Sequence, residues 1–422
     1  MPRPVQRVLT ALLLAGAVFG LEATFDHIVP DAAWRQLALF AMVNVIAALS
    51  LNVINGMAGQ FSIGHAGFVG IGAYTGAVVA GAIHQRFGTD EILFGNSFLV
   101  MPAVLVSAGL MAALFGLIVG LPSLRLRGDY LAIVTLGFAE IFRLVIATAQ
   151  TGDPTAGTIS RALGSLGGQN GYAGPDDAGV PQYAGPFWMF GAVVLATIIA
   201  WRLKFSGWGR ALRALREDEI ASAAVGVDPT RYKVTSFVIS AAGAGIAGGL
   251  LASMRDGNPT VQPDQFTFNY SFDAITMVIL GGSGSVSGAI VGGVLVTFTV
   301  KMIEQLQGLD SIQALKAAYP ALDLNALRMV IYASILIGLM ILRPEGLFGE
   351  RELFRRARKK GKGPTGAPPE PIPATTEAEA LAEAAGDGGS GGEPGAAPTP
   401  PETEPPGTAI EREEKKVGRD FE

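Results

Sequence analysis

Long apolar runs separated by short polar stretches occupy most of the chain up to about residue 350. A helix needs about 20 consecutive apolar residues to cross the hydrocarbon core of a bilayer. The runs therefore predict eight transmembrane helices, at residues 8–25, 37–54, 61–83, 97–121, 130–149, 186–203, 233–254 and 325–342.

One further apolar region, residues 272–300, is interrupted by Gly281, Gly282, Gly284 and Gly288. It predicts either two short crossings or one re-entrant hairpin, and both leave the later topology unchanged. The predicted fold class is all-α: a polytopic transmembrane helix bundle of 8 to 10 crossings with glycine-broken helices and a disordered C-terminal tail.

The end of the chain has a different composition. Residues 1–350 form the predicted transmembrane domain, and residues 351–422 are a basic stretch followed by an acidic tail. Gly361–Glu422 contains 13 acidic and 5 basic residues and is rich in Pro, Gly and Ala. Such a segment buries too little apolar surface to offset the entropy of ordering, so we predict that it is disordered.

Composition supports a membrane protein. Half of all residues are hydrophobic, 16% are charged, and mean hydropathy is +0.40. A soluble protein with these values would expose too much apolar surface to water. The chain has no cysteine and three scattered histidines, which excludes a disulfide framework and predicts no metal site.

Basic residues indicate the orientation. Lysine and arginine gather at residues 125–127, 202–233 and 343–360, which fall on one side if the crossings alternate. Cytoplasmic loops carry an excess of these residues, so we predict that this side and both termini are cytoplasmic. The first apolar run is either a retained helix or a cleaved signal peptide.

Two glycine-crowded segments, Gly56–Gly72 and Gly281–Gly293, are apolar but poor in helix formers. A broken helix leaves backbone groups unpaired, which a membrane tolerates only where they face protein or a water-filled cavity. We expect a solute to supply such partners along a translocation path. The candidate path residues are Gly59, Ser62, Gly64, His65, Gly67, Gly282, Ser283, Gly284 and Ser285. The alternative is close helix packing through small residues.

The polar loop at residues 208–233 predicts a capped cytoplasmic helix. Its residues favour a helix from Arg210 to Val225, Gly226 provides the C-terminal stop, and Asp228 caps the next helix. We expect a docking surface here, the alternative being a solvated loop that obeys the positive-inside bias. The candidate coupling residues are Arg216, Asp218, Glu219, Gly226 and Asp228.

Glu140 and Arg143 form a predicted intramembrane charge pair, because their three-residue spacing lets one neutralise the other on a helix face. A role in gating is the alternative. The chain has no phosphate-cradling loop, no nucleophile elbow and no ladder of intramembrane carboxylates. If the chain transports a solute, the energy is therefore expected from a separate protein.

Five stretches carry a more specific pattern: LNVINGMAGQFSIGHAGFVGIGAY (51–74), LRLRGDYLAIVTLGFAEIFRLV (124–145), GRALRALREDEIASAAVGVDPTRYKV (209–234), MVILGGSGSVSGAIVGG (277–293) and LRPEGLFG (342–349). In this order they resemble the integral-membrane permease of branched-chain amino-acid ABC importers, the larger of the two permease types in LIV-like systems. The resemblance covers most of residues 37–349.

The resemblance implies a permease subunit that is not an enzyme and sits in the lipid bilayer of the cell (inner) membrane. Its implied partners are a second permease subunit, two cytoplasmic ATPase subunits and a periplasmic or extracellular solute-binding protein, with no nucleic acid. No cofactor is implied, since the ATPase subunits bind ATP. The capped helix resembles the family's coupling helix through Glu219, Gly226 and Asp228, although Ile220 stands where the general importer signature has glutamate.

The sequence does not decide the identity of the substrate, which is either leucine, isoleucine or valine or a related solute such as urea or a short amide. Two other functions also stay open. One is a self-sufficient secondary carrier or channel for small polar solutes. The other is a membrane anchor or sensor whose tail recruits partners.

Overall fold

The computed structural model of the chain describes residues 16, 19, 20, 22, 24–87, 97–123, 129–149, 163–307, 333, 334, 337, 338, 341, 343, 346–349 and 352. All of them belong to one of two compact units of the chain, Met1–Arg356. The predicted acidic tail lies outside the described residues. The predicted helices at 8–25 and 325–342 lie mostly outside them.

The described part of the chain is helical and contains no β-strand. Its elements are α2 (Ala32–Leu51), the π-helix η1 (Asn52–Met57), α3 (His65–Phe87), α4 (Ser97–Ser123), α5 (Asp129–Ala147), η2 (Gly168–Asn170), η3 (Pro175–Asp177), α7 (Pro186–Phe205), α8 (Gly207–Glu217), α9 (Glu219–Ala224), α10 (Pro229–Ala252), η4 (Pro263–Phe266), α11 (Phe268–Gly281) and α12 (Val286–Gln307).

Six described helices are long and apolar enough to cross a membrane: Ala32–Met57, His65–Phe87, Ser97–Ser123, Tyr130–Ala147, Pro186–Phe205 and Pro229–Ala252. They confirm six of the predicted apolar spans. Their ends are set by capping chemistry. The first begins at Ala32 and not at residue 37, because Asp31 accepts a hydrogen bond from the Ala33 backbone N–H at 2.8 Å.

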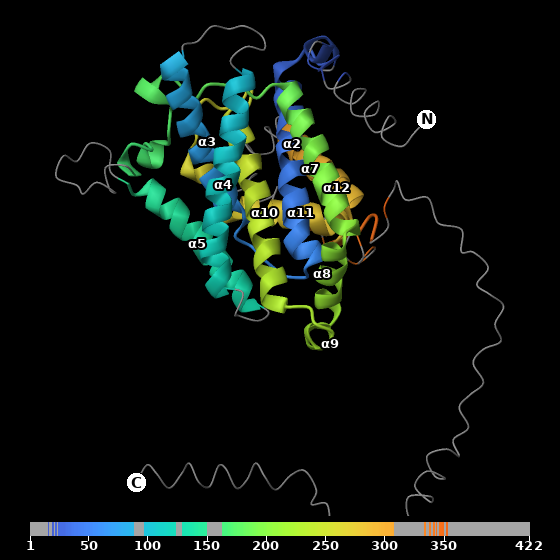
Figure 1. The fold of residues 1–422 in the computed structure, drawn as a ribbon. Coiled ribbons are helices and arrows are strands. Elements are labelled where there is room, and N and C mark those ends of the chain that lie inside the picture. Colours follow the sequence, from blue (N-terminus) through green and yellow to red (C-terminus); the bar gives the residue numbers. More distant parts are fainter. Residues whose placement is uncertain are drawn as a thin grey trace, which may run out of the picture. The chain divides into compact units, whose positions relative to one another are not determined.

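The helices differ in how much protein surrounds them. In α2, 83% of the most apolar window is buried, compared with 28% in α5 and 17% in α7. In Figure 1, α2 and α10 lie inside the bundle, α4 and α5 lie towards one side, and α8 and α9 lie at one end. Exposed apolar side chains on α4, α5 and α7 suit contact with lipid or with another membrane subunit.

Close helix contact depends on glycine where α3 crosses α10. A side chain at Gly72 would meet the backbone of Gly245, and one at Gly248 would meet the backbone of Val69. This is the small-residue packing that membrane helices use, because lipid gives little hydrophobic driving force for association.

The region at 272–300 forms two helices, α11 and α12, separated by a break at residues 282–285. They pack as an antiparallel hairpin, with Gly281 against Gly288 and Gly292 against Met277. With 14 residues, α11 is about 21 Å long, which is shorter than the hydrocarbon core of about 30 Å. One arm of the hairpin is therefore too short to cross the membrane alone.

Candidate functional site

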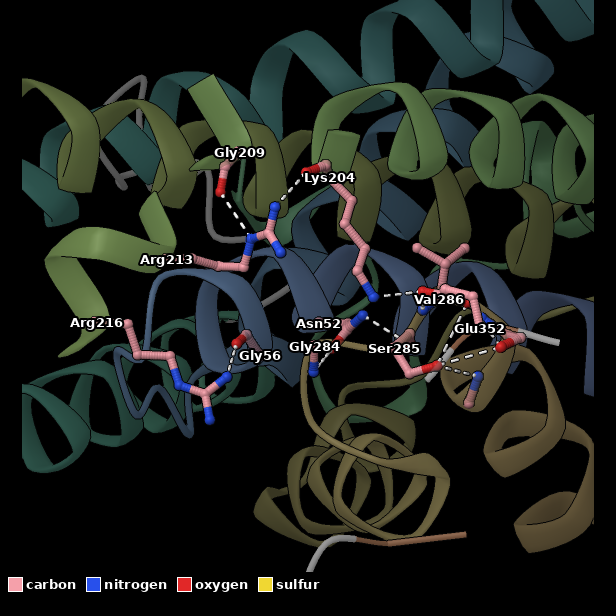
Figure 2. Close-up of polar contacts among 12 residues, drawn as sticks. Asn52, Gly56, Lys204, Gly209, Arg213, Arg216, Gly284, Ser285, Val286 and Glu352 are labelled. Atoms are coloured by element: carbon pink, nitrogen blue, oxygen red, sulfur yellow. Dashed lines mark hydrogen bonds and ion pairs between the residues drawn. The ribbon is translucent and has the colours of Figure 1, made fainter. Parts of the chain in front are cut away.

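The two predicted breaks pack directly against each other. A side chain at Gly56 would meet the backbone of Gly284, so the first break leaves room for nothing between itself and the second. The buried Asn52 side chain joins them: its Oδ1 accepts from the Gly284 N–H at 2.8 Å, and its Nδ2 donates to the Ser285 carbonyl at 3.0 Å (Figure 2). We call this contact the junction, defined by Asn52, Gly56, Gly284 and Ser285.

The chain departs from α-helix at the first break in two steps. A π-helix over Asn52–Met57 is followed by irregular chain that returns to helix at His65, with Gly59 at a φ of 67°. Asn55 stabilises this irregular segment, because its Oδ1 accepts from the Ser62 N–H at 3.2 Å. The Ile63 N–H donates to the Thr135 hydroxyl at 3.1 Å. Protein side chains therefore satisfy these exposed backbone groups.

These contacts contradict the expectation that a solute completes the broken backbone. Asparagine, threonine and serine side chains already bind these groups at the first break, and Asn52 does so at the second. The error arises because sequence alone does not reveal which side chains face a break. Contact of a solute with these residues stays a prediction.

The other candidate path residues are packed among helices. Gly64 and Gly67 lie against Thr135 and Ala139 of α5, where a side chain would collide with the α5 backbone. His65 is 2% exposed and its Nε2 lies 3.1 Å from the Ser50 hydroxyl. None of the nine candidates lines either polar cavity described below.

The junction is tied to α8 by Arg216. The Arg216 guanidinium donates to the Gly56 carbonyl at 2.8 Å (Figure 2). The Arg216 side chain also lies against Gly59. On the same helix, Arg213 donates to the Gly209 and Lys204 carbonyls, each at 3.3 Å, which holds α8 against the end of α7. The charge-assisted hydrogen bond from Arg216 connects α8 to the first break.

A buried ion pair lies beside the junction. Lys204 at the end of α7 donates to the Glu352 carboxylate at 2.5 Å, and the two side chains are 5% and 1% exposed. The carboxylate also accepts from the Val286 and Ser287 N–H groups at 2.8 and 3.0 Å. Glu352 therefore caps the N-terminus of α12, where the helix dipole favours a negative charge.

The surroundings of Glu352 act on its acidity in two directions. Burial raises the pKa of the carboxyl, but the hydrogen bonds from Lys204 and from the start of α12 outweigh burial. The pKa therefore lies below its ordinary value, and the carboxylate stays charged near neutral pH. Sequence reasoning missed this residue because it assigned residues 351–422 to a polar segment after the membrane domain.

The predicted helix from Arg210 to Val225 is two helices in the structure. Asp218 interrupts it with extended backbone, φ −151° and ψ 113°, and its carboxylate caps α9 by accepting from the Ile220 and Ala221 N–H groups. An aspartate competes for backbone donors in this way, which favours a cap over a helix interior. The single-helix prediction was therefore wrong at Asp218.

The predicted C-terminal stop at Gly226 and the predicted cap of the next helix at Asp228 are both present. Gly226 follows α9 with a φ of 89°, a left-handed conformation that suits glycine. Asp228 caps α10 by accepting from the Arg231 N–H at 3.2 Å. Glu219 forms an ion pair with Lys233 at 2.6 Å, so α9 is fastened to the first turns of α10.

The loop around α9 exposes large apolar side chains. Ile220 and Val225 are each 81% exposed, the highest values among the large apolar residues of the described chain. They sit at an end of the bundle, beyond the last turn of the candidate span α7 and before the first turn of the candidate span α10. Two exposed apolar side chains on one short segment are candidates for contact with another protein or with the membrane surface.

The predicted charge pair forms. Arg143 Nε lies 2.6 Å from Glu140 Oε2, as the three-residue spacing requires. Arg143 also reaches Asp264 of η4 at 3.3 Å, so the pair connects α5 to the segment before α11. Its role in gating stays a prediction.

Two polar cavities, which sequence reasoning also missed, adjoin α2 on the side of α11. Each has a volume of about 310 Å³, and both are lined by Gln36, Phe40, Met254 and Tyr270. The signal that could have found the first of them is Asn44, an amide within an apolar span, which normally faces a protein interior or a cavity. Within the described residues, no group of three His, Asp or Glu side chains could hold a metal ion.

Comparisons with known proteins agree with this architecture. Residues 35–342 match the family model described as branched-chain amino acid transport system / permease component. No solved structure was found to match the chain.

Three curated relatives are transport permeases. The high-affinity branched-chain amino acid transport system permease protein LivM of Escherichia coli K12 is 35% identical over 74% of this chain and 69% of its own length. A probable LivM of Methanocaldococcus jannaschii is 27% identical over 75% of this chain and 93% of its own. The high-affinity branched-chain amino acid transport system permease protein LivH of Salmonella typhimurium is 25% identical over 73% of this chain and 92% of its own length. The chain belongs to the family of permease components of branched-chain amino acid transport systems.

Proposed function

We propose that this chain is the permease subunit of an ATP-binding cassette importer that moves branched-chain amino acids, or related small amides, across the inner membrane. The observation that carries the proposal is the connection from the exposed side chains of α9, through Arg216 on α8, to the junction between the two breaks. Such a connection suits a protein that receives mechanical work at one end and uses it inside the membrane.

The proposed assembly contains this chain, a second permease subunit, two cytoplasmic ATPase subunits and an external solute-binding protein. Relatives of both the LivM and LivH types support a pair of different permeases. The chain crosses the membrane eight to ten times in this proposal. Both termini and the α8–α9 segment face the cytoplasm, in agreement with the basic residues in that segment.

The proposed coupling path starts at α9, where Ile220 and Val225 dock into an ATPase subunit. Asp218, Gly226 and Asp228 fix the ends of α9 and of its neighbours, and Glu219 holds α9 to α10. When the ATPase moves α9, Arg216 pulls on the Gly56 carbonyl. Gly59 and Gly284, one candidate path residue from each break, lie at or next to this contact, so they move with it.

The test is ATP hydrolysis by the reconstituted complex. Replacing Ile220 by Glu places a charge in the proposed contact, and we expect hydrolysis stimulated by the loaded binding protein to fall by about tenfold or more. The matched control is Ile28→Glu, because Ile28 is also exposed, at 64%, but precedes α2 at the opposite end.

Equal stimulation in both variants would contradict docking at α9. Leucine uptake by liposomes that contain this chain alone would favour a self-sufficient carrier instead. Uptake that survives deletion of 361–422 but not disruption of the junction would exclude the anchor or sensor alternative.

A further inference from the structure

The two polar cavities lie away from α9. The chain enters α10 next to α9 and leaves it at Ala252, so the loop between α10 and α11 lies at the opposite end. One cavity of about 310 Å³ reaches into this loop, to Asn258 and Thr260. The other, also about 310 Å³, runs along α2 from Ala33 to Asn44. Because they share four lining residues, the two cavities adjoin each other.

The inner end of the second cavity is built from a buried hydrogen-bond network. Asn44 is 3% exposed; its Nδ2 donates to the Thr297 hydroxyl at 2.9 Å, and its Oδ1 accepts from the Tyr270 hydroxyl at 3.3 Å. These residues come from α2, α12 and α11, so the network fixes the three helices around one space. A satisfied network of this kind keeps polar groups in place beside an opening.

The walls of this cavity carry both signs of charge. Asp273 projects from α11 and Lys301 from α12, and both are partly exposed. The remaining wall includes Met277 and Val300, which are apolar. Such a lining is complementary to a molecule with an ammonium group, a carboxylate and an aliphatic side chain.

A third and larger cavity in the described bundle has a different character. It has a volume of about 740 Å³ and lies between α2, α4, α7 and α10, and its lining contains no charged residue. Leu195 and Val106, which line it, are 59% and 60% exposed. It suits a lipid chain, which makes it a useful comparison for solute binding.

We propose that the cavity between α2, α11 and α12 is a binding site for a zwitterionic aliphatic amino acid on its way through the membrane. Asp273 binds the ammonium group, Lys301 binds the carboxylate, and the wall at Met277 and Val300 receives the side chain. The substrate competes for these two charged groups with their contacts in the protein. This inference rests on the proposed function, and it selects amino acids over uncharged urea and amides.

The test uses the absence of cysteine from the chain. In the full complex, without binding protein, Val300→Cys is labelled by a water-soluble maleimide and this subunit is then isolated. At a leucine concentration about ten times its Kd, labelling is expected to slow about tenfold, because free sites fall by that factor. Urea and 4-methylpentanoate, which lacks the ammonium group, leave labelling unchanged, and adding Asp273→Asn removes the protection by leucine.

Leu195→Cys is the matched control, since it lines the uncharged cavity and leucine leaves its labelling unchanged. Met277→Cys replaces Val300→Cys if the latter fails to assemble. Labelling of both cavity cysteines at the same rate with and without leucine would overturn the site. Uptake by the wild-type complex separates the two proposals: leucine import with unprotected cysteines rejects only the site, whereas no import of any candidate solute rejects the permease function.

Discussion

Two polar regions of this bundle differ in what surrounds their buried polar groups. At the junction, Asn52 and Arg216 bind backbone groups of the two breaks, and no space separates Gly56 from Gly284. Around Asn44, polar side chains instead border an open volume of about 310 Å³. Both regions use an asparagine of the same membrane span, so residue type alone does not distinguish them.

The difference indicates that the two regions have different functions. A polar group whose partners are all protein atoms contributes to rigidity and fixes one arrangement. A polar group beside an open cavity can exchange partners with a solute. The junction is therefore suited to transmit force, and the cavity to bind what is moved. Mutations should separate the two regions, since the junction governs stability and coupling while the cavity governs solute binding.

The largest effect is expected at the buried ion pair beside the junction. Lys204→Met leaves the Glu352 carboxylate buried without its cation, which should lower the free energy of unfolding by about 3–5 kcal/mol. The measurement is thermal unfolding of the detergent-solubilised complex. Lys233→Met is the control: its partner Glu219 is 41% exposed, so the expected loss is below about 1 kcal/mol.

The stability of the protein at low pH should depend on the carboxylate of Glu352. The folded-state pKa of Glu352 lies below its ordinary value of 4.5, so its stabilising contribution is complete above that pH and is lost as the pH falls through the folded-state pKa. Glu352→Gln should reduce the loss of stability in acid. Equal stability of Lys204→Met and Lys233→Met, or an unchanged acid profile in Glu352→Gln, would refute a structural role for this pair.

A smaller loss is expected from filling the contact between the breaks. Gly56→Ala places a methyl group against the Gly284 backbone, and overpacking of this kind costs about 1–3 kcal/mol. We expect reduced coupling, measured as leucine imported per ATP hydrolysed. Gly137→Ala is the control, because nothing lies within 4 Å of its added carbon and alanine favours helix by about 1 kcal/mol. A Gly56→Ala complex with normal coupling would show that the breaks move independently.

The smallest change in stability is expected in the cavity. Asn44→Leu removes two hydrogen bonds worth about 1 kcal/mol each, and the added apolar packing partly offsets the loss. Thr297 keeps its bond to the Gly293 carbonyl at 2.7 Å. Uptake should nevertheless fall strongly while ATP hydrolysis continues. If Asn44→Leu instead destabilises the complex as much as Lys204→Met, the contrast between the two regions fails.

The spans were predictable because membrane thickness imposes a length on every apolar run. Local chemistry was also readable where it involves near neighbours, as in the Glu140–Arg143 pair and the Asp228 cap. The predicted helix across Asp218 was wrong because helix propensity and capping compete there, and the side-chain cap prevails.

The contacts between distant residues could not be read in the same way. Lys204 and Glu352 lie 148 positions apart, and neither has a local signal for the other. Asn52 was hidden within an apolar run, although its side chain links the first break to the backbone of the second. Glycine was correctly recognised at both interruptions, although Gly67 and Gly72 lie inside α3 and Gly288 and Gly293 lie inside α12. Whether protein or solute completes an interruption depends on the three-dimensional neighbours.

Asn44 and Asn52 belong to one uninterrupted helical rod, which is formed by α2 and η1. The two asparagines are separated along the helix axis by about 12 Å. In the proposed coupling this rod acts as a lever: a small tilt at the end that Arg216 contacts would displace the cavity wall formed by its other end. Such a movement would need no relay of side-chain rearrangements, and its amplitude would depend on the stiffness of a single helix.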